Sequence, residues 1–193
     1  MKTLTAVLFA GGESRRMGAD KATLAINGEP LWSRQLRILQ ALQPEKILVS
    51  ARRRPVWCPP EIEVVPDKIP RLGPLGGLQA GLGRAETTHL LALAVDLPLM
   101  TAGCLAKIFA HARPGCGAVV KADFYEPLCA VYPVSDAVRA LVAEYASSPM
   151  HSLQPLVACL VEKKWMRALP ACDFDPRLFA NVNTPDELGN LNR

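Results

Sequence analysis

The sequence lacks the features of membrane, zinc-finger and disulfide-rich proteins. No apolar run approaches the ~20 residues of a membrane-spanning helix, and the short run near the N-terminus is followed by glycines and arginines rather than by a signal-peptide cleavage segment. None of the six cysteines forms a C-x-x-C pair, and no histidine stands at metal-finger spacing to a cysteine. We therefore expect a cytoplasmic protein without membrane association, whose thiols are reduced and mostly buried.

Composition excludes disorder but does not choose a ligand. Half of the 193 residues are hydrophobic and 21% are charged, which is typical of a globular chain. The 22 basic and 18 acidic residues give a net charge of +4, which suits an anionic small ligand as well as nucleic acid. Because no repeat, low-complexity tract or clear linker interrupts the chain, one domain over residues 1–193 is expected.

Short apolar runs alternate with helix-like patterns along the chain. The runs predict strands over residues 4–10, 46–50, 62–65, 89–95, 118–122, 128–132 and 165–169. Helices are expected from Pro30, over residues 78–84, 102–112, 135–145 and 153–160, and from Pro185. This alternation predicts an α/β fold with three layers, in which a mostly parallel central sheet carries helices on both faces.

Three features fall at the carboxyl ends of these strands, where open parallel sheets bind their ligands. They are the loop over residues 10–21 (AGGESRRMGADK), the turn over residues 73–77 (GPLGG), and Asp96. The loop combines glycines, whose amides can approach an anion closely, with arginine and lysine side chains that bind phosphate. It is neither a P-loop nor a G-x-G-x-x-G fingerprint, and its composition fits a triphosphate site and a solvated basic turn equally well.

Asp96 is the more informative position, because it directly follows the most apolar strand of the chain. A carboxylate there needs a partner, and Mg²⁺ bridging it to a phosphate would satisfy it. The alternative is that Asp96 caps the helix after Pro98, although Thr101 is another candidate for that cap. Position favours the metal. Asp67 also follows a strand, but by itself it is typical of a turn.

Two asparagines near the C-terminus form a further candidate site. Asn181 and Asn183 flank one valine and therefore point to the same side of an extended segment. Their amides can ligate a metal or donate to phosphate, while Thr184 and Pro185 predict a helix start in either case. The histidines are scattered, and the tryptophans at 32, 57 and 165 are not spaced as a stacking platform.

Taken together, these motifs resemble the molybdenum cofactor guanylyltransferases. The run AGGESRRMGADKA is similar to the signature loop of nucleotidyltransferases that activate sugars and cofactors. Three more segments agree in order and spacing: GPLGGLQAGL, VDLPLM and FANVNTPDEL. EPLCAVY is also similar to a segment of that family. The resemblance covers essentially the whole chain and implies a Rossmann-like nucleotidyltransferase fold.

The resemblance implies that GTP and molybdopterin-bound molybdenum cofactor are converted, with Mg²⁺, to the guanine dinucleotide cofactor and pyrophosphate. Proteins of cofactor biosynthesis or acceptor enzymes would be transient partners, with no nucleic acid or membrane involved.

The resemblance also implies site residues. The nucleotide-binding residues would be Phe9, Ala10, Gly11, Gly12, Lys21, Ser50, Asp67 and Asp96. The catalytic residues would be Arg16, Lys21 and Asp96, and the metal ligands Asp96 and Asn183, with Asn181 as a possible addition. The candidates for binding the pterin are Arg71, Lys121 and Glu126.

Two departures from the family pattern concern the base. Phe9 stands where leucine is usual, and Ser50 stands where some relatives have asparagine. The second glycine of the loop favours guanine over cytosine by analogy with the family, because relatives that transfer cytidylyl groups more often carry alanine there. The alternative function is a cytidylyltransferase of the same cofactor or a sugar-phosphate nucleotidyltransferase. A non-catalytic binding module is disfavoured by the intact Arg16, Lys21 and Asp96.

Overall fold

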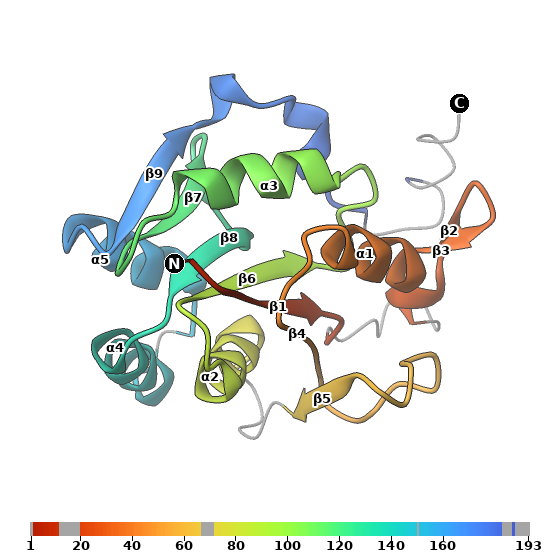
Figure 1. Cartoon of the computed structure of the whole chain (residues 1–193), viewed down its shortest axis with the longest axis horizontal. Coiled ribbons are helices and arrows are strands. Elements are labelled where there is room, and N and C mark those ends of the chain that lie inside the picture. The colour runs from red at the N-terminus through yellow and green to blue at the C-terminus, as the bar shows by residue number, and fades with distance from the viewer. Residues whose placement is uncertain (1, 12–19, 67–71, 150, 183–186, 188–193) are drawn as a thin grey trace.

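A seven-stranded sheet runs through the centre of the molecule (Figure 1). The computed structural model describes residues 2–11, 20–66, 72–149, 151–182 and 187. The strand order across the sheet is β5-β4-β1-β6-β8-β7-β9. The strands are β1 (Leu4–Phe9), β4 (Lys46–Ala51), β5 (Glu63–Pro66), β6 (His89–Ala94), β7 (Gly117–Lys121), β8 (Tyr125–Pro133) and β9 (Met166–Pro170).

All neighbouring strands of this sheet are parallel except those that pair with β8. β1 pairs in parallel with both β4 and β6, β4 with β5, and β7 with β9, whereas β8 is antiparallel to β6 and β7. Only three residues join β7 to β8, and so short a connection can form only a hairpin. The predicted mostly parallel sheet is confirmed, with one reversed strand and a shorter turn than the polar run 123–127 suggested.

Helices cover both faces of the sheet, as the three-layer prediction requires. On one face lie α1 (Leu31–Gln40) and α3 (Ala102–His111); on the other lie α2 (Pro74–Arg84), α4 (Asp136–Ser147) and α5 (Leu153–Glu162) (Figure 1). The hydroxyls of Thr101, Ser135 and Ser152 accept backbone N–H groups at the starts of α3, α4 and α5. These caps explain why the three helices begin where the sequence predicted.

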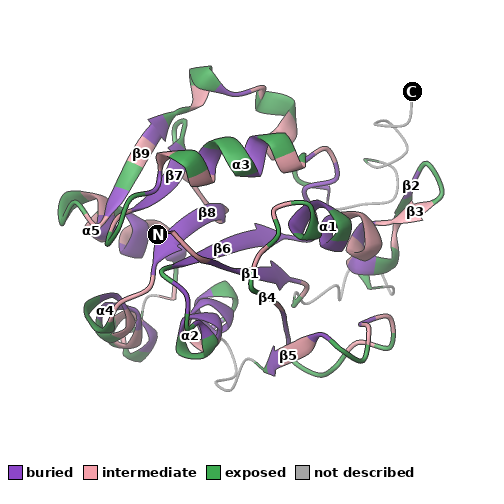
Figure 2. Cartoon of the chain, viewed as in Figure 1, coloured by how far each residue is buried: buried purple, intermediate pink, exposed green. Residues whose placement is uncertain are grey.

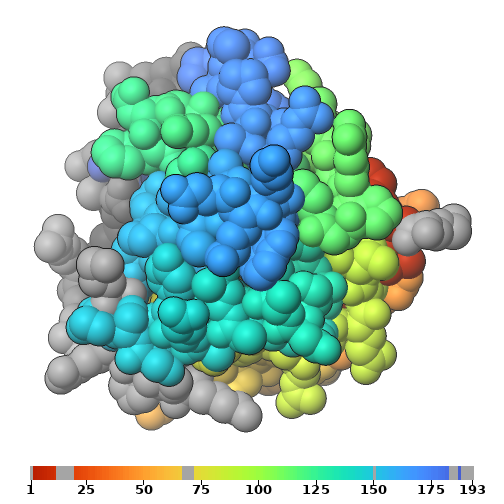
Figure 3. All heavy atoms as spheres, turned by 90° about the vertical axis from the view of Figure 1, so that its left-hand side faces the viewer, coloured from red at the N-terminus to blue at the C-terminus, as the bar shows by residue number. Residues whose placement is uncertain are grey.

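The strands are buried between the two helical layers, whose outer faces are exposed (Figure 2). All six residues of β1 and of β6 are buried, which explains their continuous apolar runs. At the β9 edge, residues of α4, α5 and β9 form the surface of the molecule (Figure 3). No helix of the described residues is long and apolar enough to cross a membrane.

A small hairpin beside α1 was absent from the sequence prediction. It consists of β2 (Ala25–Ile26) and β3 (Glu29–Pro30), which follow the one-turn 3-10 helix η1 (Lys21–Thr23). Asn27 and Gly28 form its turn with φ values of 51° and 79°, which is the conformation that tight hairpin turns require. Two further 3-10 turns, η2 (Ala171–Asp173) and η3 (Pro176–Phe179), follow β9.

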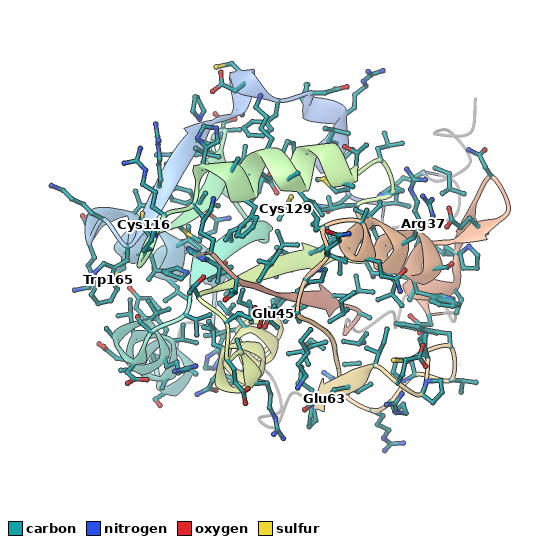
Figure 4. The ribbon with its side chains drawn as sticks, in the orientation of Figure 1. Arg37, Glu45, Glu63, Cys116, Cys129 and Trp165 are labelled. Carbon is teal, nitrogen blue, oxygen red and sulfur yellow. The ribbon has the colours of Figure 1, made fainter. Side chains whose placement is uncertain are left out.

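Cysteines contribute to the core as thiols. All six lie in described residues, none forms a disulfide, and Cys58, Cys104 and Cys129 are buried. Cys129 lies between α3 and the sheet (Figure 4), where burial raises the pKa of its thiol well above the ordinary value. A thiol held protonated in this way is a poor nucleophile.

Candidate active site

The ends of three parallel strands meet at the carboxyl edge of the sheet. Phe9, the last residue of β1, pairs with Ser50 of β4 on one side and with Ala94 of β6 on the other. The pairing continues beyond the strands, since the Ala10 N–H donates to the Ser50 carbonyl (3.0 Å) and the Val95 N–H to the Phe9 carbonyl (3.0 Å). The first loop and Asp96 therefore leave the sheet side by side, as predicted.

The structure brings Lys21 and Asp96 together. Lys21 is the first residue of η1, and its Nζ lies 3.6 Å from Oδ2 of Asp96. The two side chains are 24% and 26% exposed, so the pair is partly shielded but still reachable from solvent. A cation and a carboxylate that lie 75 positions apart in the sequence thus meet at the carboxyl edge of the sheet.

The backbone that carries Asp96 is held from two directions. The Asp96 carbonyl accepts from the Val182 N–H at 3.0 Å. The next two carbonyls accept from α1: Gln35 Nε2 donates to Leu97 (2.6 Å) and Arg34 Nε donates to Pro98 (2.7 Å). These bonds fix the direction in which the Asp96 carboxylate leaves the sheet. Sequence reasoning did not find the two α1 side chains, because their partners are backbone atoms more than 60 positions away.

Asp96 does not cap α3, which was the alternative role considered for it, because Thr101 makes that cap. Thr101 Oγ1 accepts from the Cys104 N–H at 3.2 Å, which is the N-cap bond of α3. The Asp96 carboxylate is therefore not used by that helix. The bond from Val182 to Asp96 also brings the exposed Asn181 to this edge.

The turn GPLGG places the start of α2 against the carboxyl ends of β1 and β4. A Cβ built on Gly77 would lie 2.2 Å from Ser50 Oγ and 2.8 Å from Phe9 Cε1. A side chain at position 77 would therefore force the Ser50 hydroxyl and the Phe9 ring to move. Ser50 is 5% exposed, and no hydrogen bond of its hydroxyl is found among the described residues. This three-way contact was not predicted, although the paired glycines early in the helix were a visible signal.

The family resemblance implies that Phe9 and Ser50 contact a nucleotide. We therefore expect Gly77→Ala to lower nucleotide affinity by at least ~10-fold, because the new methyl group must displace the Ser50 hydroxyl or the Phe9 ring. The matched control is Gly83→Ala in the same helix, where a Cβ meets nothing within 4 Å. Titration calorimetry with GTP measures both variants. Equal affinities for the two would show that the contact has no bearing on the binding site.

Four predicted site residues cannot be placed. Gly12, Arg16, Asp67 and Asn183 lie outside the described residues. Of the others, Phe9, Ala10, Gly11, Ser50, Lys21 and Asp96 lie at the carboxyl edge described above. Gly11 follows the Ala10–Ser50 bond, and a Cβ on it would make only ordinary contact, 3.5 Å, with Ser50 and Ala51.

Comparison with known sequences identifies the family. The sequence profile of the MobA-like NTP transferase domain matches residues 6–175. The chain belongs to this family. A probable molybdenum cofactor guanylyltransferase of Opitutus terrae is 36% identical over 188 residues, which cover 95% of this chain and 92% of the relative. A molybdenum cofactor guanylyltransferase of Xanthomonas euvesicatoria is 33% identical over 191 residues, 97% of this chain and 93% of the relative.

Solved structures agree on the fold of this NTP transferase. The molybdopterin-guanine dinucleotide biosynthesis protein A of Archaeoglobus fulgidus superposes with a TM-score of 0.70 at 20% identity, covering 96% of this chain and 95% of that one. The 2-C-methyl-D-erythritol 4-phosphate cytidylyltransferase of Thermus thermophilus gives 0.69 at 14% identity, covering 96% of each chain. Both show the nucleotidyltransferase fold that the sequence motifs implied.

The donor set of this NTP transferase fits a magnesium ion better than a structural metal. Within the described residues, no group of three or more histidine, cysteine, aspartate or glutamate side chains is close enough to hold a metal by itself. The edge offers the Asp96 carboxylate, a hard oxygen ligand. Mg²⁺ commonly binds through one or two carboxylates and takes its remaining ligands from water and substrate phosphates.

The residues considered for the pterin lie on or near the β7–β8 hairpin, apart from Arg71, which lies outside the described residues. Glu126 is partly buried in β8, and burial raises the pKa of its carboxyl group. Lys121 Nζ lies 5.1 Å from the centre of the Tyr125 ring. The hairpin thus presents a carboxyl group and a cation, but no contact joins either to Asp96.

Proposed function

We propose that this protein transfers GMP from GTP to molybdopterin-bound molybdenum cofactor and releases pyrophosphate. Relatives that align with nearly the whole chain are named for this activity, and the family match makes the chain a nucleotidyltransferase. Because that match spans residues 6–175, we treat the chain as one nucleotidyltransferase domain. In the structure, the proposal is best supported by Lys21 and Asp96, which lie 3.6 Å apart at the carboxyl edge of the sheet.

The proposed reaction needs no nucleophile from the protein. An oxygen of the terminal phosphate of the pterin attacks the α-phosphorus of GTP in line and forms the new P–O bond. The bond from the α-phosphorus to the oxygen that leads to the β-phosphate breaks, and pyrophosphate leaves with that electron pair. No oxidant or reductant takes part. The protein has to hold two anions in line and offset their charge.

The residues at the edge divide this work between them. Asp96, with Asn183, would hold Mg²⁺, which when bound neutralises phosphate charge. Lys21 donates N–H groups to the phosphate at which charge develops, and Arg16 and Gly12 hold the triphosphate. The nucleoside is held by Phe9, Ala10, Gly11, Ser50 and Asp67.

The test is incubation of the protein with molybdopterin-bound cofactor, Mg²⁺ and each of GTP, CTP, UTP and ATP, followed by mass analysis of the product. We expect the guanine dinucleotide with GTP, little product with the other three nucleotides, and a thermal shift with GTP that chelation of Mg²⁺ removes. Product formation or stabilisation with CTP but not with GTP would contradict the proposal and indicate a cytidylyltransferase. Cofactor binding without turnover of any nucleotide would indicate a binding module.

A further inference from the structure

Two tryptophans that are far apart in the sequence stack beside the end of the first loop. Trp32 is the second residue of α1, and Trp57 lies in the loop between β4 and β5. Their ring centres are 5.4 Å apart and the rings are inclined by 16°. The spacing of the tryptophans in the sequence does not indicate this stack, because chain folding rather than sequence spacing brings the two rings together.

Trp57 also makes a directed contact with the residue that precedes Lys21. Its Nε1 donates to Oδ2 of Asp20 at 2.9 Å. The other carboxylate oxygen of Asp20 accepts the Ala22 N–H at 3.0 Å and thereby caps η1, the turn that begins with Lys21. The Asp20 carbonyl accepts two further bonds from Thr23. One carboxylate therefore connects the Trp57 ring to the turn from which Lys21 reaches Asp96.

The loop that carries Trp57 is itself held in shape. The Arg54 guanidinium donates to the carbonyls of Pro59 (3.1 Å), Pro60 (3.4 Å) and Ile62 (2.7 Å), so it bridges the loop from within. The Cys58 N–H donates to the Pro55 carbonyl at 3.1 Å and closes a turn around Trp57. The Trp57 ring is thus held by hydrogen bonds within its own loop and by stacking on the Trp32 ring, and from this position it donates to Asp20.

We propose that Trp57 is a positioning residue for Lys21, acting through the carboxylate of Asp20. The inference rests on the proposed function, because it assumes that Lys21 contacts the reacting phosphate. The indole N–H restricts the carboxylate to one orientation, the carboxylate orients the first turn of η1, and that turn directs the Lys21 side chain toward Asp96. Small displacements of a charged group from a reacting atom reduce the rate far more than they reduce ground-state binding.

The pair of tryptophans supplies its own matched control. Trp57→Phe keeps an aromatic ring for the stack but removes the N–H that donates to Asp20. Trp32→Phe makes the same change in the other ring, whose N–H has no hydrogen bond among the described residues. We expect Trp57→Phe to lower kcat by about 10-fold with the KM for GTP within about twofold, and Trp32→Phe to leave both near the wild-type values.

A second variant removes the same hydrogen bond by changing its acceptor, Asp20, instead of its donor, Trp57. Asp20→Ser retains a good cap for η1, but its shorter side chain cannot also reach the Trp57 N–H. It should reproduce the kcat loss of Trp57→Phe while the circular dichroism spectrum remains that of the wild type. It also keeps the test decisive if Trp57→Phe does not fold.

A double-mutant cycle separates positioning from a general structural role. In a Lys21→Met background, Trp57→Phe should cause no further loss of the residual rate, because the group that it positions is gone. An equal 10-fold loss in both backgrounds would overturn the inference, as would identical kinetic constants for Trp57→Phe and Trp32→Phe beside a fully active wild type. A wild type that forms no guanine dinucleotide would instead refute the proposed function, and the inference would fall with it.

Discussion

Replacing Asp96 with alanine or asparagine is expected to abolish pyrophosphate release, with a loss of at least about 10³-fold in kcat. In the proposed mechanism this carboxylate holds Mg²⁺ as a hard oxygen ligand, and asparagine cannot replace its charge. The loss should appear in continuous pyrophosphate detection with GTP, Mg²⁺ and the molybdenum cofactor. Excess Mg²⁺ should restore part of the rate of the asparagine variant, whose amide oxygen remains a weak ligand.

The variants of Asp96 should remain folded. Their direct ionic partner in the structure is Lys21, and both side chains are about a quarter exposed, so solvent screens the pair and its loss costs at most about 1 kcal/mol of unfolding free energy. The three backbone bonds around the residue do not involve its side chain. A suitable control is Glu86→Gln, an exposed carboxylate in the turn between α2 and β6, before the amino end of β6. A folded Asp96→Ala protein that releases pyrophosphate at the wild-type rate would refute the metal-binding role.

The position of Asp96 could be predicted because it depends on topology rather than on side-chain detail. A fully apolar strand belongs at the centre of the sheet, and the residue after it must emerge at the carboxyl edge. The first loop follows another buried strand, and strands β1 and β6 are neighbours. Two parallel neighbours end at the same edge whatever the rest of the chain does. The meeting of Lys21 with Asp96 follows from that fact and from the length of the loop.

The contacts of Gly77 and Trp57 could not be predicted in the same way. Each depends on how far one segment approaches another: Gly77 on the depth at which α2 packs against β1 and β4, and Trp57 on the path of an irregular loop. Sequence periodicity carries information on which face of an element is buried, but none on such distances. The hairpin at Asn27 and Gly28 is different, because its turn signal was present and its two-residue strands were too short to show alternation.

Lys21 poses the sharper mechanistic question, because a lysine beside a triphosphate can serve binding, catalysis or both. We expect Lys21→Met to lower kcat by about 10²-fold while the dissociation constant for GTP rises by no more than about threefold. The reason is that its charge lies 3.6 Å from Asp96, the carboxylate that we propose to hold Mg²⁺, and not at Ser50 and Gly77, where we propose that the base binds. A cation in that place gains most as negative charge moves onto the departing pyrophosphate.

The control for Lys21 is a second lysine–carboxylate pair at the other end of the sheet. Lys46 Nζ lies 2.6 Å from Glu63 Oε2 at the amino ends of β4 and β5. The hydrogen bond from Lys46 and the charges of Lys46 and Arg84 lower the pKa of the Glu63 carboxyl group. Lys46→Met removes a paired charge of the same kind and should leave kcat unchanged. A Lys21→Met protein with wild-type kcat and weak GTP binding would assign Lys21 to substrate binding alone. A fall in kcat at near-constant affinity, absent from Lys46→Met, would place its charge at the reacting phosphate, because only an interaction that strengthens in the transition state can separate the two constants.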